Sequence, residues 1–347
     1  MHMSANPLSP NYLKEPTPYS IRATINPKVL NGIKDYLTAA NADCLDEAER
    51  NFNVKADKIS PILREFANYR LNRADYCFNL DPVELEMGCS AKQLFDLIRQ
   101  GHIPRHFQLA KEYCKKSKKM RPYEHDFRLE SKSGVISFYL KHAQLLDRFG
   151  DCPDLENARE LLRFEMKHFY PKIYAMSKPI KNRVQKEMLE SESPEAVWND
   201  IFNGDIVNPT MELLSDVTSE SVVQTYFNKV VRKGDYFTLD GARWMVKAHN
   251  FRNDKEERLL FVLEQVSKYR GIPNAMKKMS GVDLADFKRS LKDLDKIFVN
   301  PVTIPRDWGI PHIPNPLKAY YEKMYETRLL TRSEYQFEKL LKEYLHG

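Results

Sequence analysis

The chain has 347 residues, of which 42% are hydrophobic and 29% charged, a balance that excludes a disordered protein and allows two domains. No apolar run approaches the roughly 20 residues of a membrane-spanning helix, which argues against a membrane protein. The five cysteines are scattered and form no CxxC pair, so we expect reduced thiols in a cytoplasm.

The first elements are short and interrupted. Prolines break the periodicity of residues 1–18, which we expect to be a flexible lead-in. Residues 19–25 alternate between apolar and polar side chains and predict a first strand. Helical spacing follows over about 27–37 and 46–68.

Residues 72–81 carry the most informative pattern of the chain. With the two-residue period of a strand, Ala74, Tyr76, Phe78 and Leu80 fall on one face, and Arg73, Asp75, Cys77, Asn79 and Asp81 fall on the other. A solvated amphipathic strand is one interpretation. The other is a working surface that presents carboxylates.

Two further strands divide in the same way, and they favour the working surface. Residues 161–167 place Arg163, Glu165 and Lys167 on one face, and residues 134–142 do the same with Ser137, Tyr139 and Lys141. Side by side, the three strands would form a sheet with one apolar face. Its other face would suit divalent metal ions and phosphate groups.

The elements around these strands complete the predicted fold. Ser90 is a suitable N-cap for a helix through Arg99, and a short strand at 127–129 should pair with 135–142 across a turn at 131–134. A helix from Tyr170 to about residue 189 should break near Pro179. We therefore predict an α+β domain at 19–193, with a mostly antiparallel five-stranded sheet covered by helices.

From residue 194 the pattern becomes helical, and we expect a winged-helix-like DNA-binding domain over 194–347. Residues 271–278 and 281–294 read as two helices joined by a turn, the form of a helix-turn-helix. The second of these helices carries the cations Lys288, Arg289 and Lys292.

Positive charge is concentrated in two other segments. The first holds Arg105, Lys115, Lys116, Lys118, Lys119 and Arg121, and the second includes Lys172 and Lys178. Either block alone could be a solvated loop. Because both flank the strands that bear carboxylates, and concentrated cations attract polyanions by counterion release, nucleic acid is the favoured partner.

The chemistry that fits these residues is phosphodiester cleavage. The chain lacks a phosphate-binding GxxxxGK[ST] loop and a GxGxxG motif. Asp75, Asp81 and Glu165 offer the hard oxygen ligands that Mg²⁺ or Mn²⁺ prefers. His106, four residues after His102, is a further metal candidate.

A tyrosine is the candidate nucleophile of this chemistry. Tyr170 and Tyr174 follow the Glu165 strand and can share one helix face, next to Lys172 and Lys178. Alternatively, one or both tyrosines pack against the sheet.

Several segments together resemble a known family, the replication proteins of Gram-positive phages, plasmids and integrative elements, grouped with the filamentous-phage gene II/X replication initiators. The similar segments are 72–81, 101–106, 162–165, 287–294, 300–305 and 308–311, and the resemblance covers about residues 19–325. It implies a rolling-circle initiator that binds double-stranded origin DNA and nicks one strand through a tyrosine. The protein stays on the 5′ phosphate, leaves a free 3′-OH for the host replication machinery, and later rejoins the nicked single strand.

The resemblance also implies residue roles. Tyr174, or else Tyr170, would be the nucleophile, Asp75 and Glu165 would bind Mg²⁺ or Mn²⁺, and the strand from Tyr139 to Lys141 would line the site. Many nicking initiators use a His-apolar-His pair instead, and no histidine here has that spacing. The protein would act in the cytoplasm of a bacterial host, without a membrane partner. Both a monomer and a homodimer are compatible with the sequence.

Two other functions compete with this interpretation. One is a non-catalytic, sequence-specific DNA-binding protein of the repressor or partition type, which would use the C-terminal helices. The other is a single-strand or RNA-binding module. Such a module is disfavoured because the polar sheet face carries acids where stacking aromatics are needed.

Overall fold

A computed structural model describes residues 2–7, 19–61, 63, 65–66, 69–114, 118–190, 209–324 and 332–346. The chain forms two compact units, one from Met1–Asn72 and Ile173–Thr218, the other from Arg73–Lys172 and Ser219–Gly347. The boundary expected at residues 193–194 lies outside the described residues.

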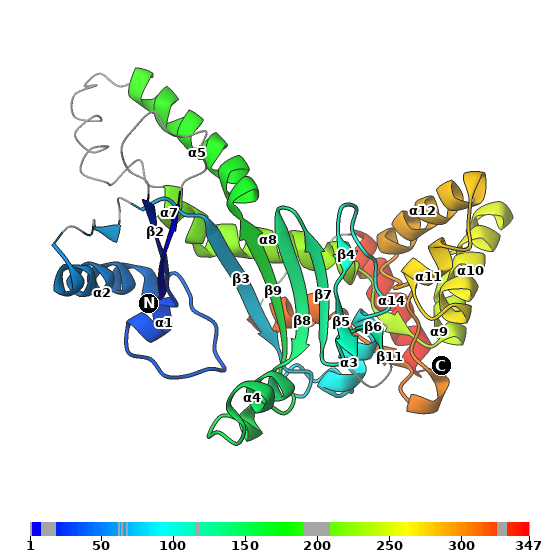
Figure 1. The fold of residues 1–347 in the computed structure, drawn as a ribbon. Helices are drawn as coiled ribbons and strands as arrows, with labels where there is room; N and C mark the ends of the chain where they lie inside the picture. Colours follow the sequence, from blue (N-terminus) through cyan, green and yellow to red (C-terminus); the bar gives the residue numbers. More distant parts are fainter. Residues whose placement is uncertain are drawn as a thin grey trace. The chain divides into compact units, whose positions relative to one another are not determined.

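The second unit contains the predicted five-stranded antiparallel sheet (Figure 1). Its strands lie in the order β3-β9-β8-β7-β4, and every neighbouring pair is antiparallel. The strands are β3 (Arg73–Leu80), β4 (Gln108–Leu109), β7 (Asp126–Ser131), β8 (Gly134–Leu140) and β9 (Leu162–Phe169). The α+β fold class and the sheet are therefore confirmed.

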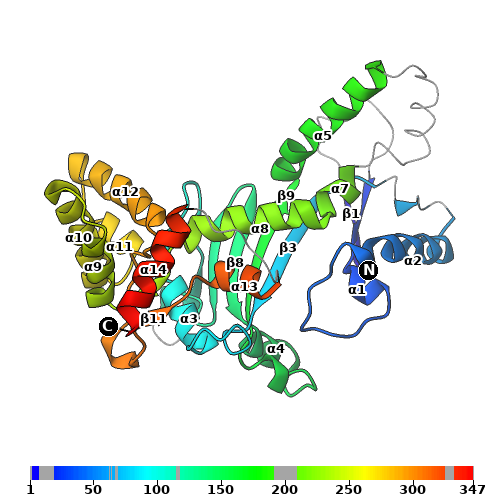
Figure 2. The same ribbon diagram turned by 180° about the vertical axis from the view of Figure 1, so that it is seen from behind.

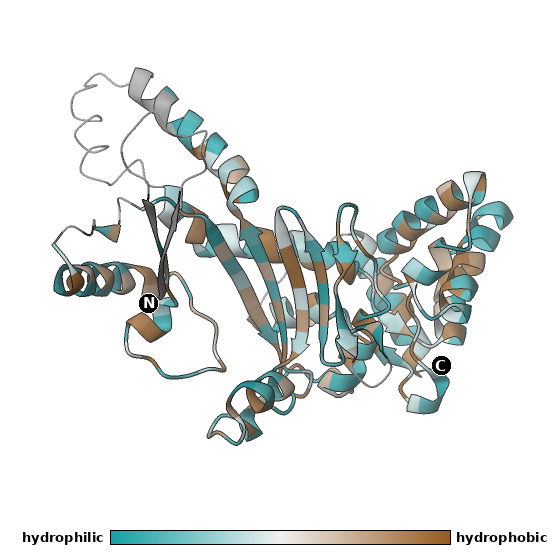
Figure 3. Cartoon of the chain, in the orientation of Figure 1, coloured by the Kyte–Doolittle hydropathy of each residue, from teal (hydrophilic) through white to brown (hydrophobic). Residues whose placement is uncertain are grey.

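The alternation of side chains sets which face of the sheet is buried. In β3, Ala74, Tyr76, Phe78 and Leu80 are buried as predicted, and apolar and polar residues alternate along the strands (Figure 3). The hairpin between β7 and β8 also forms as expected, with the Ser131 hydroxyl donating to the Gly134 carbonyl at 3.0 Å.

Helices cover the apolar face (Figure 2). The ring of Phe227 on α8 (Asp216–Val230) lies 5.6 Å from the rings of Phe78, Phe138 and Phe164, measured between centroids. The helix α3 (Ala91–Ile98) begins at Ser90, whose hydroxyl accepts from the Gln93 N–H in a capping box, as predicted for this N-cap. The four rings of Phe78, Phe138, Phe164 and Phe227 form an aromatic cluster at the centre of the core.

A buried histidine interrupts the apolar face. His168 is fully buried between Tyr76 and Tyr226, each ring centroid 5.3 Å from its own, and neither ring nitrogen has a hydrogen-bond partner in the described part of the chain. Burial, together with the charges of Lys172 and Lys229, lowers the pKa of His168 to about 4. The ring is therefore neutral at pH 7.

This histidine should make stability depend on pH. Between the folded pKa of about 4 and the ordinary value near 6.5, the unfolded chain binds more protons, so the unfolding free energy falls as the pH falls. The expected slope is about 1.4 kcal/mol per pH unit. Replacing His168 by Phe should flatten the fall in melting temperature between pH 7 and pH 4.5, measured by circular dichroism. Parallel curves for the two proteins would show that His168 does not carry this linkage.

The C-terminal part of the second unit is helical. Its elements are α9 (Leu239–Ala248), α10 (Asn253–Lys268), α11 (Ile272–Met276), α12 (Gly281–Lys296), α13 (Pro316–Met324), α14 (Arg332–His346), and the paired strands β10 (Tyr236–Phe237) and β11 (His312–Ile313). The buried Asp235, next to β10, connects this strand with β11 and the start of α13. Its carboxylate accepts a hydrogen bond from the Asn315 N–H at 2.9 Å and lies 2.8 Å from His312 Nε2. The pair α11 and α12 occupies the predicted helix-turn-helix segment, and a winged-helix domain stays a prediction.

The first unit differs from the sequence expectations in its strands and in its helices. The expected lead-in contains a strand, β1 (His2–Pro7), and its partner β2 (Tyr19–Thr24) forms a separate two-stranded sheet with it. Local alternation identified β2 but could not show which strand it pairs with. The helix α5 (Tyr170–Glu190) runs through Pro179 without the expected break.

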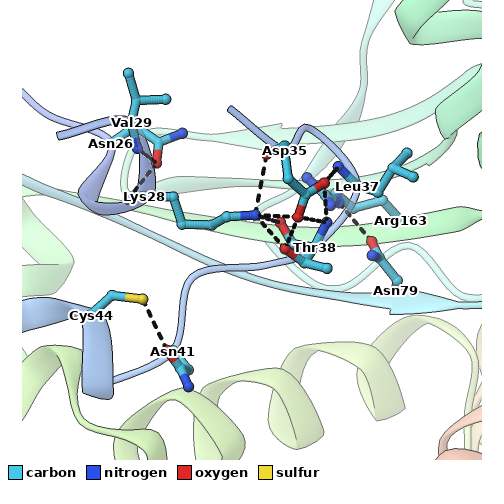
Figure 4. Close-up of polar contacts among 10 residues, drawn as sticks. All are labelled: Asn26, Lys28, Val29, Asp35, Leu37, Thr38, Asn41, Cys44, Asn79 and Arg163. Carbon is cyan, nitrogen blue, oxygen red and sulfur yellow. Dashed lines mark hydrogen bonds and ion pairs between the residues drawn. The ribbon is translucent and has the colours of Figure 1, made fainter. Parts of the chain in front are cut away.

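The described part of this unit also contains α1 (Pro27–Leu30), α2 (Asp43–Ile59) and α7 (Pro209–Leu214). The first two are shorter than the helices expected over 27–37 and 46–68. Lys28 stabilises the loop after α1 because its ammonium group donates to the Asp35 carboxylate at 2.7 Å and to the Thr38 carbonyl at 3.2 Å (Figure 4). Burial alone would raise the pKa of Asp35, but the hydrogen bonds from Lys28 and Thr38 hold it below its ordinary value.

None of the helices in the described ranges is both long and apolar enough to span a membrane.

Candidate functional site

The polar face of the sheet brings the predicted residues of three strands together. In the observed register, Glu165 on β9 lies directly opposite Cys77 on β3 and Ser137 on β8. One pair further along, Arg163 lies opposite Asn79 and Tyr139, and its Nε donates to the Asn79 amide oxygen at 2.7 Å (Figure 4). The three strands thus share one polar surface, as predicted.

Glu165 is the central acid of this surface. Its carboxylate accepts a hydrogen bond from the Tyr139 hydroxyl at 2.5 Å and lies 3.2 Å from the Lys167 ammonium group. Burial raises the pKa of Glu165, but the charge of Lys167 and the hydrogen bonds from Tyr139 and Lys167 outweigh burial and lower it. The Glu165 carboxylate is therefore ionised at neutral pH.

An open pocket of about 590 Å³ lies over Glu165. Its lining includes the β7, β8 and β9 side chains Asp126, Arg128, Ser137, Tyr139, Glu165 and Lys167. Arg148 of α4 (Lys141–Phe149) also contributes, as does Arg121 of a hairpin formed by β5 (Lys111–Cys114) and β6 (Lys119–Pro122). The pocket is a charged site that belongs entirely to the second unit.

Asp126 and Arg128 are site residues that sequence reasoning missed. Arg128 Nη2 donates to Asp126 Oδ2 at 2.7 Å, and Arg128 lies directly opposite Ser137. Burial raises the pKa of Asp126, while Arg128 and Lys167 oppose the shift. The alternation of Asp126, Arg128 and Glu130 along β7 was a signal for them, but only residues 127–129 were expected to form that strand.

The other predicted metal ligands are not part of the pocket lining, although Asp75 lies directly opposite the lining residue Lys167. Asp75 forms a two-pronged ion pair with Arg73, at 2.7 and 2.5 Å. Asp81 accepts from the N–H groups of Val83 and Glu84 at 3.0 and 3.1 Å, which caps the turn after β3. His106 is exposed, with a positive φ of 72°. None of the three lines the pocket.

Lys141 requires a correction, because it does not continue the β8 strand. It is the first residue of α4, where Lys141 and Leu145 are both buried at helical spacing. Its ammonium group donates to the Gln144 side chain at 2.7 Å. Burial and the charge of Arg163 lower the pKa of Lys141 to about 8, against the opposing charge of Glu165. Lys141 is therefore close to the polar face without lining the pocket.

The two candidate nucleophiles lie at the start of α5. Tyr170 immediately follows β9 in the second unit, and 39% of it is exposed. Tyr174 belongs to the first unit and is 56% exposed. Both side chains are open to solvent, and Tyr170 does not line the pocket.

The predicted DNA-binding cations lie in four places. Arg105 is exposed in a loop, while Lys118, Lys119 and Arg121 are exposed on the β5–β6 hairpin, where Arg121 pairs with Glu112 at 3.2 Å. Lys115 and Lys116 lie outside the described residues. On α5, Lys178 is exposed and Lys172 is half-buried.

The fourth place is α12. Lys288, Arg289 and Lys292 are exposed along it, and Arg289 lies 2.6 Å from Asp286. Lys288 and Lys292 therefore present positive charge to solvent on the second helix of the predicted helix-turn-helix.

The donor chemistry of the pocket fits a hard divalent cation only in part. Glu165 is ionised, and Asp126 Oδ1 is buried without a hydrogen-bond partner in the described part of the chain. With Glu112, Glu124 and Asp147, five acidic residues line the pocket. Carboxylate oxygens are the ligands that Mg²⁺ and Mn²⁺ prefer. Within the described ranges, however, no three His, Cys, Asp or Glu side chains are grouped closely enough to hold a metal ion.

Comparison of the chain with protein-family models, with curated proteins and with solved structures finds no match.

Proposed function

We propose that this protein is a rolling-circle replication initiator, which nicks one strand of origin DNA through a tyrosine and later rejoins it. The observation that supports this most is the ionised Glu165 carboxylate in an open, cation-bearing pocket on the polar face of the sheet. The cations would stabilise the negative charge that grows on a scissile phosphate during cleavage, and the carboxylate would hold a metal ion that acts in the same way.

The pocket residues have separate tasks in this proposal. Lys167, Arg121, Arg128 and Arg148 hold phosphate oxygens. Tyr139 and Lys167 orient Glu165, which would hold a divalent metal ion together with Asp126. A bound Mg²⁺ or Mn²⁺ would polarise the scissile phosphate as a Lewis acid.

The covalent step conserves the number of phosphodiester bonds. The phenolic oxygen of Tyr174, or else of Tyr170, attacks the phosphorus and loses its proton. The bond from phosphorus to the 3′ oxygen breaks, and that oxygen takes up a proton. The 5′ phosphate stays on the tyrosine, so rejoining is the reverse reaction, and the free 3′-OH is available to the host polymerase in the bacterial cytoplasm.

Exposed cations outside the pocket account for binding of double-stranded DNA. Lys288 and Lys292 on α12 and Lys118 and Lys119 on the hairpin offer contacts to backbone phosphates. A homodimer on a repeated origin sequence is compatible with this arrangement.

A covalent-adduct assay tests the proposal. Supercoiled plasmids that carry the DNA flanking the protein's own coding sequence are incubated with the protein and Mn²⁺. We expect open circles with protein attached to the 5′ end, resistant to sodium dodecyl sulfate and removed by protease. Adduct loss in Tyr174→Phe but not in Tyr170→Phe identifies Tyr174 as the nucleophile, and the reverse result identifies Tyr170.

A non-catalytic DNA-binding protein is the second candidate, favoured by the exposed Lys288 and Lys292 on α12. Retardation of these plasmid fragments in gels, without nicking at any metal concentration, would replace the first proposal by this one. If a Lys288→Ala/Lys292→Ala variant no longer retards these fragments, α12 is the DNA-binding element.

A further inference from the structure

Charge is distributed unevenly along the C-terminal helices. No acidic residue lies between Glu264 and Asp283, whereas the segment between them contains four cations. All four are exposed: Lys268, Arg270, Lys277 and Lys278. Residues 268–278, which join α10 to α12 through α11, are called the cationic turn below (Figure 1). The helix α12, in contrast, carries as many acids as cations, so its own net charge is zero.

The chain does not neutralise the cationic turn. None of its four cations forms an ion pair with an acid in the described part of the chain, whereas on α12 Arg289 lies 2.6 Å from Asp286. The ammonium groups of Lys268 and Lys278 lie near the same ring, 5.4 and 6.0 Å from the centroid of Tyr269. The ring attracts each of them, but the two like charges repel each other. An external anion would remove this repulsion.

Backbone contacts hold the cationic turn in place. The Gly271 N–H donates to the Val266 carbonyl, and the Ile272 N–H donates to the Gln100 carbonyl, both at 2.9 Å. Gly271 has a positive φ of 128°, and a Cβ atom there would lie 3.1 Å from Gln100 Cα, so this close approach requires glycine. Ile272 and Ala275 are fully buried. Because the backbone is fixed before binding, little conformational entropy is lost when a ligand binds, and such preorganisation raises affinity.

The chemistry of the cationic turn selects a polyanion. Lysine and arginine side chains donate hydrogen bonds and accept none, so their partners are acceptor oxygens such as those of phosphate groups. Exposed cations that follow one another along a surface suit a chain of phosphates, which releases its counterions on binding. The turn also contains α11, the first helix of the predicted helix-turn-helix. In that motif the first helix crosses the sugar-phosphate backbone of the duplex.

We infer that the cationic turn binds backbone phosphates of double-stranded DNA, and that it contributes more to duplex binding than α12 does. The inference rests on the proposed function for the choice of DNA as the polyanion. It adds a phosphate-binding surface of which no residue lines the Glu165 pocket. Because phosphate contacts carry no sequence information directly, this surface should raise the affinity for any duplex.

Binding of a fluorescently labelled duplex tests the inference. Anisotropy gives the Kd in EDTA, where no metal-dependent cleavage occurs, at several salt concentrations. In Lys277→Ala/Lys278→Ala we expect the Kd at low salt to rise about tenfold, and the slope of log Kd against log salt to fall by about two, one for each lost phosphate contact. Lys288→Ala/Lys292→Ala should raise the Kd by less than about threefold, because acids on α12 balance its cations.

Two controls separate a local contact from the effects of net charge and of folding. Lys339→Ala/Lys342→Ala removes the same charge from exposed positions on α14 and should leave the Kd within about twofold of the unmodified value. Lys277→Arg/Lys278→Arg keeps the charge and should bind like the unmodified protein. Because all these lysines are exposed, the melting temperature should be the same in the four variants.

Three results would overturn the inference: an unchanged Kd in Lys277→Ala/Lys278→Ala, a larger loss in Lys288→Ala/Lys292→Ala, or an equal loss in the α14 control, which would show a response to net charge alone. These readouts do not involve nicking. If the covalent adduct forms but the Kd does not change, only this inference fails. If the Kd changes as expected but no adduct forms, only the nicking proposal fails.

Discussion

Replacing Glu165 by glutamine is expected to reduce DNA nicking by about a hundredfold or more. Glutamine keeps the shape of the side chain and can still accept the Tyr139 hydroxyl, but it lacks the charge that Lys167 and a divalent metal ion would face. Binding of DNA by α12 and the hairpin should be retained. The measurement is the rate of open-circle formation with Mn²⁺, together with gel retardation at the same protein concentration.

Glu156→Gln is the matched control for this variant. Glu156 is an exposed acid that pairs with Arg159, and it does not line the pocket. It should nick at the rate of the unmodified protein. Nicking by Glu165→Gln at the unmodified rate would rule out Glu165 as a metal ligand and would move the reaction away from this pocket.

Replacing Phe164 by alanine is expected to lower the free energy of unfolding of the second unit by about 3–5 kcal/mol. Phe164 is fully buried at the centre of the sheet, and its ring lies 4.9 Å from that of Phe138 and 5.6 Å from those of Phe78 and Phe227. The alanine leaves a cavity that the sheet on one side and α8 on the other cannot close. Urea unfolding followed by circular dichroism measures the loss.

Phe261→Ala gives the corresponding control on α10. Phe261 is 45% exposed, so its removal takes away little buried surface, and a change below about 1 kcal/mol is expected. Equal losses for the two phenylalanines would show that the aromatic cluster does not form the core of this unit.

Much of the sheet could be predicted because strand alternation is a local property. Residues 72–81 and 161–167 divide into an apolar and a polar face, and the structure buries the first and exposes Glu165 to a pocket on the second. The Ser90 cap was equally readable, since a helix N-cap depends on residues three positions apart. The strands β3, β7, β8 and β9 of the antiparallel sheet followed from such local patterns, whereas β4 (Gln108–Leu109) was not predicted.

The sequence predictions were wrong where contacts between distant parts of the chain determine the secondary structure or the strand pairing. Residues 19–24 form a strand as expected, but the strand pairs with β1 and stays out of the main sheet. Lys141 alternates correctly with the strand before it, yet it is the first residue of α4, in which Lys141 and Leu145 are buried at helical spacing. Pro179 was expected to break α5, which nevertheless continues to Glu190.

The candidate site shows the same division between local and tertiary information. Glu165 and its polar strand could be identified from the alternation alone, because side-chain direction in a strand is set by the backbone. The partners of Glu165 could not, since strand order and register depend on packing across the whole sheet. Only the tertiary structure places Ser137 opposite Glu165 and Arg128 opposite Ser137, and thereby brings Asp126 to the pocket in place of Asp75.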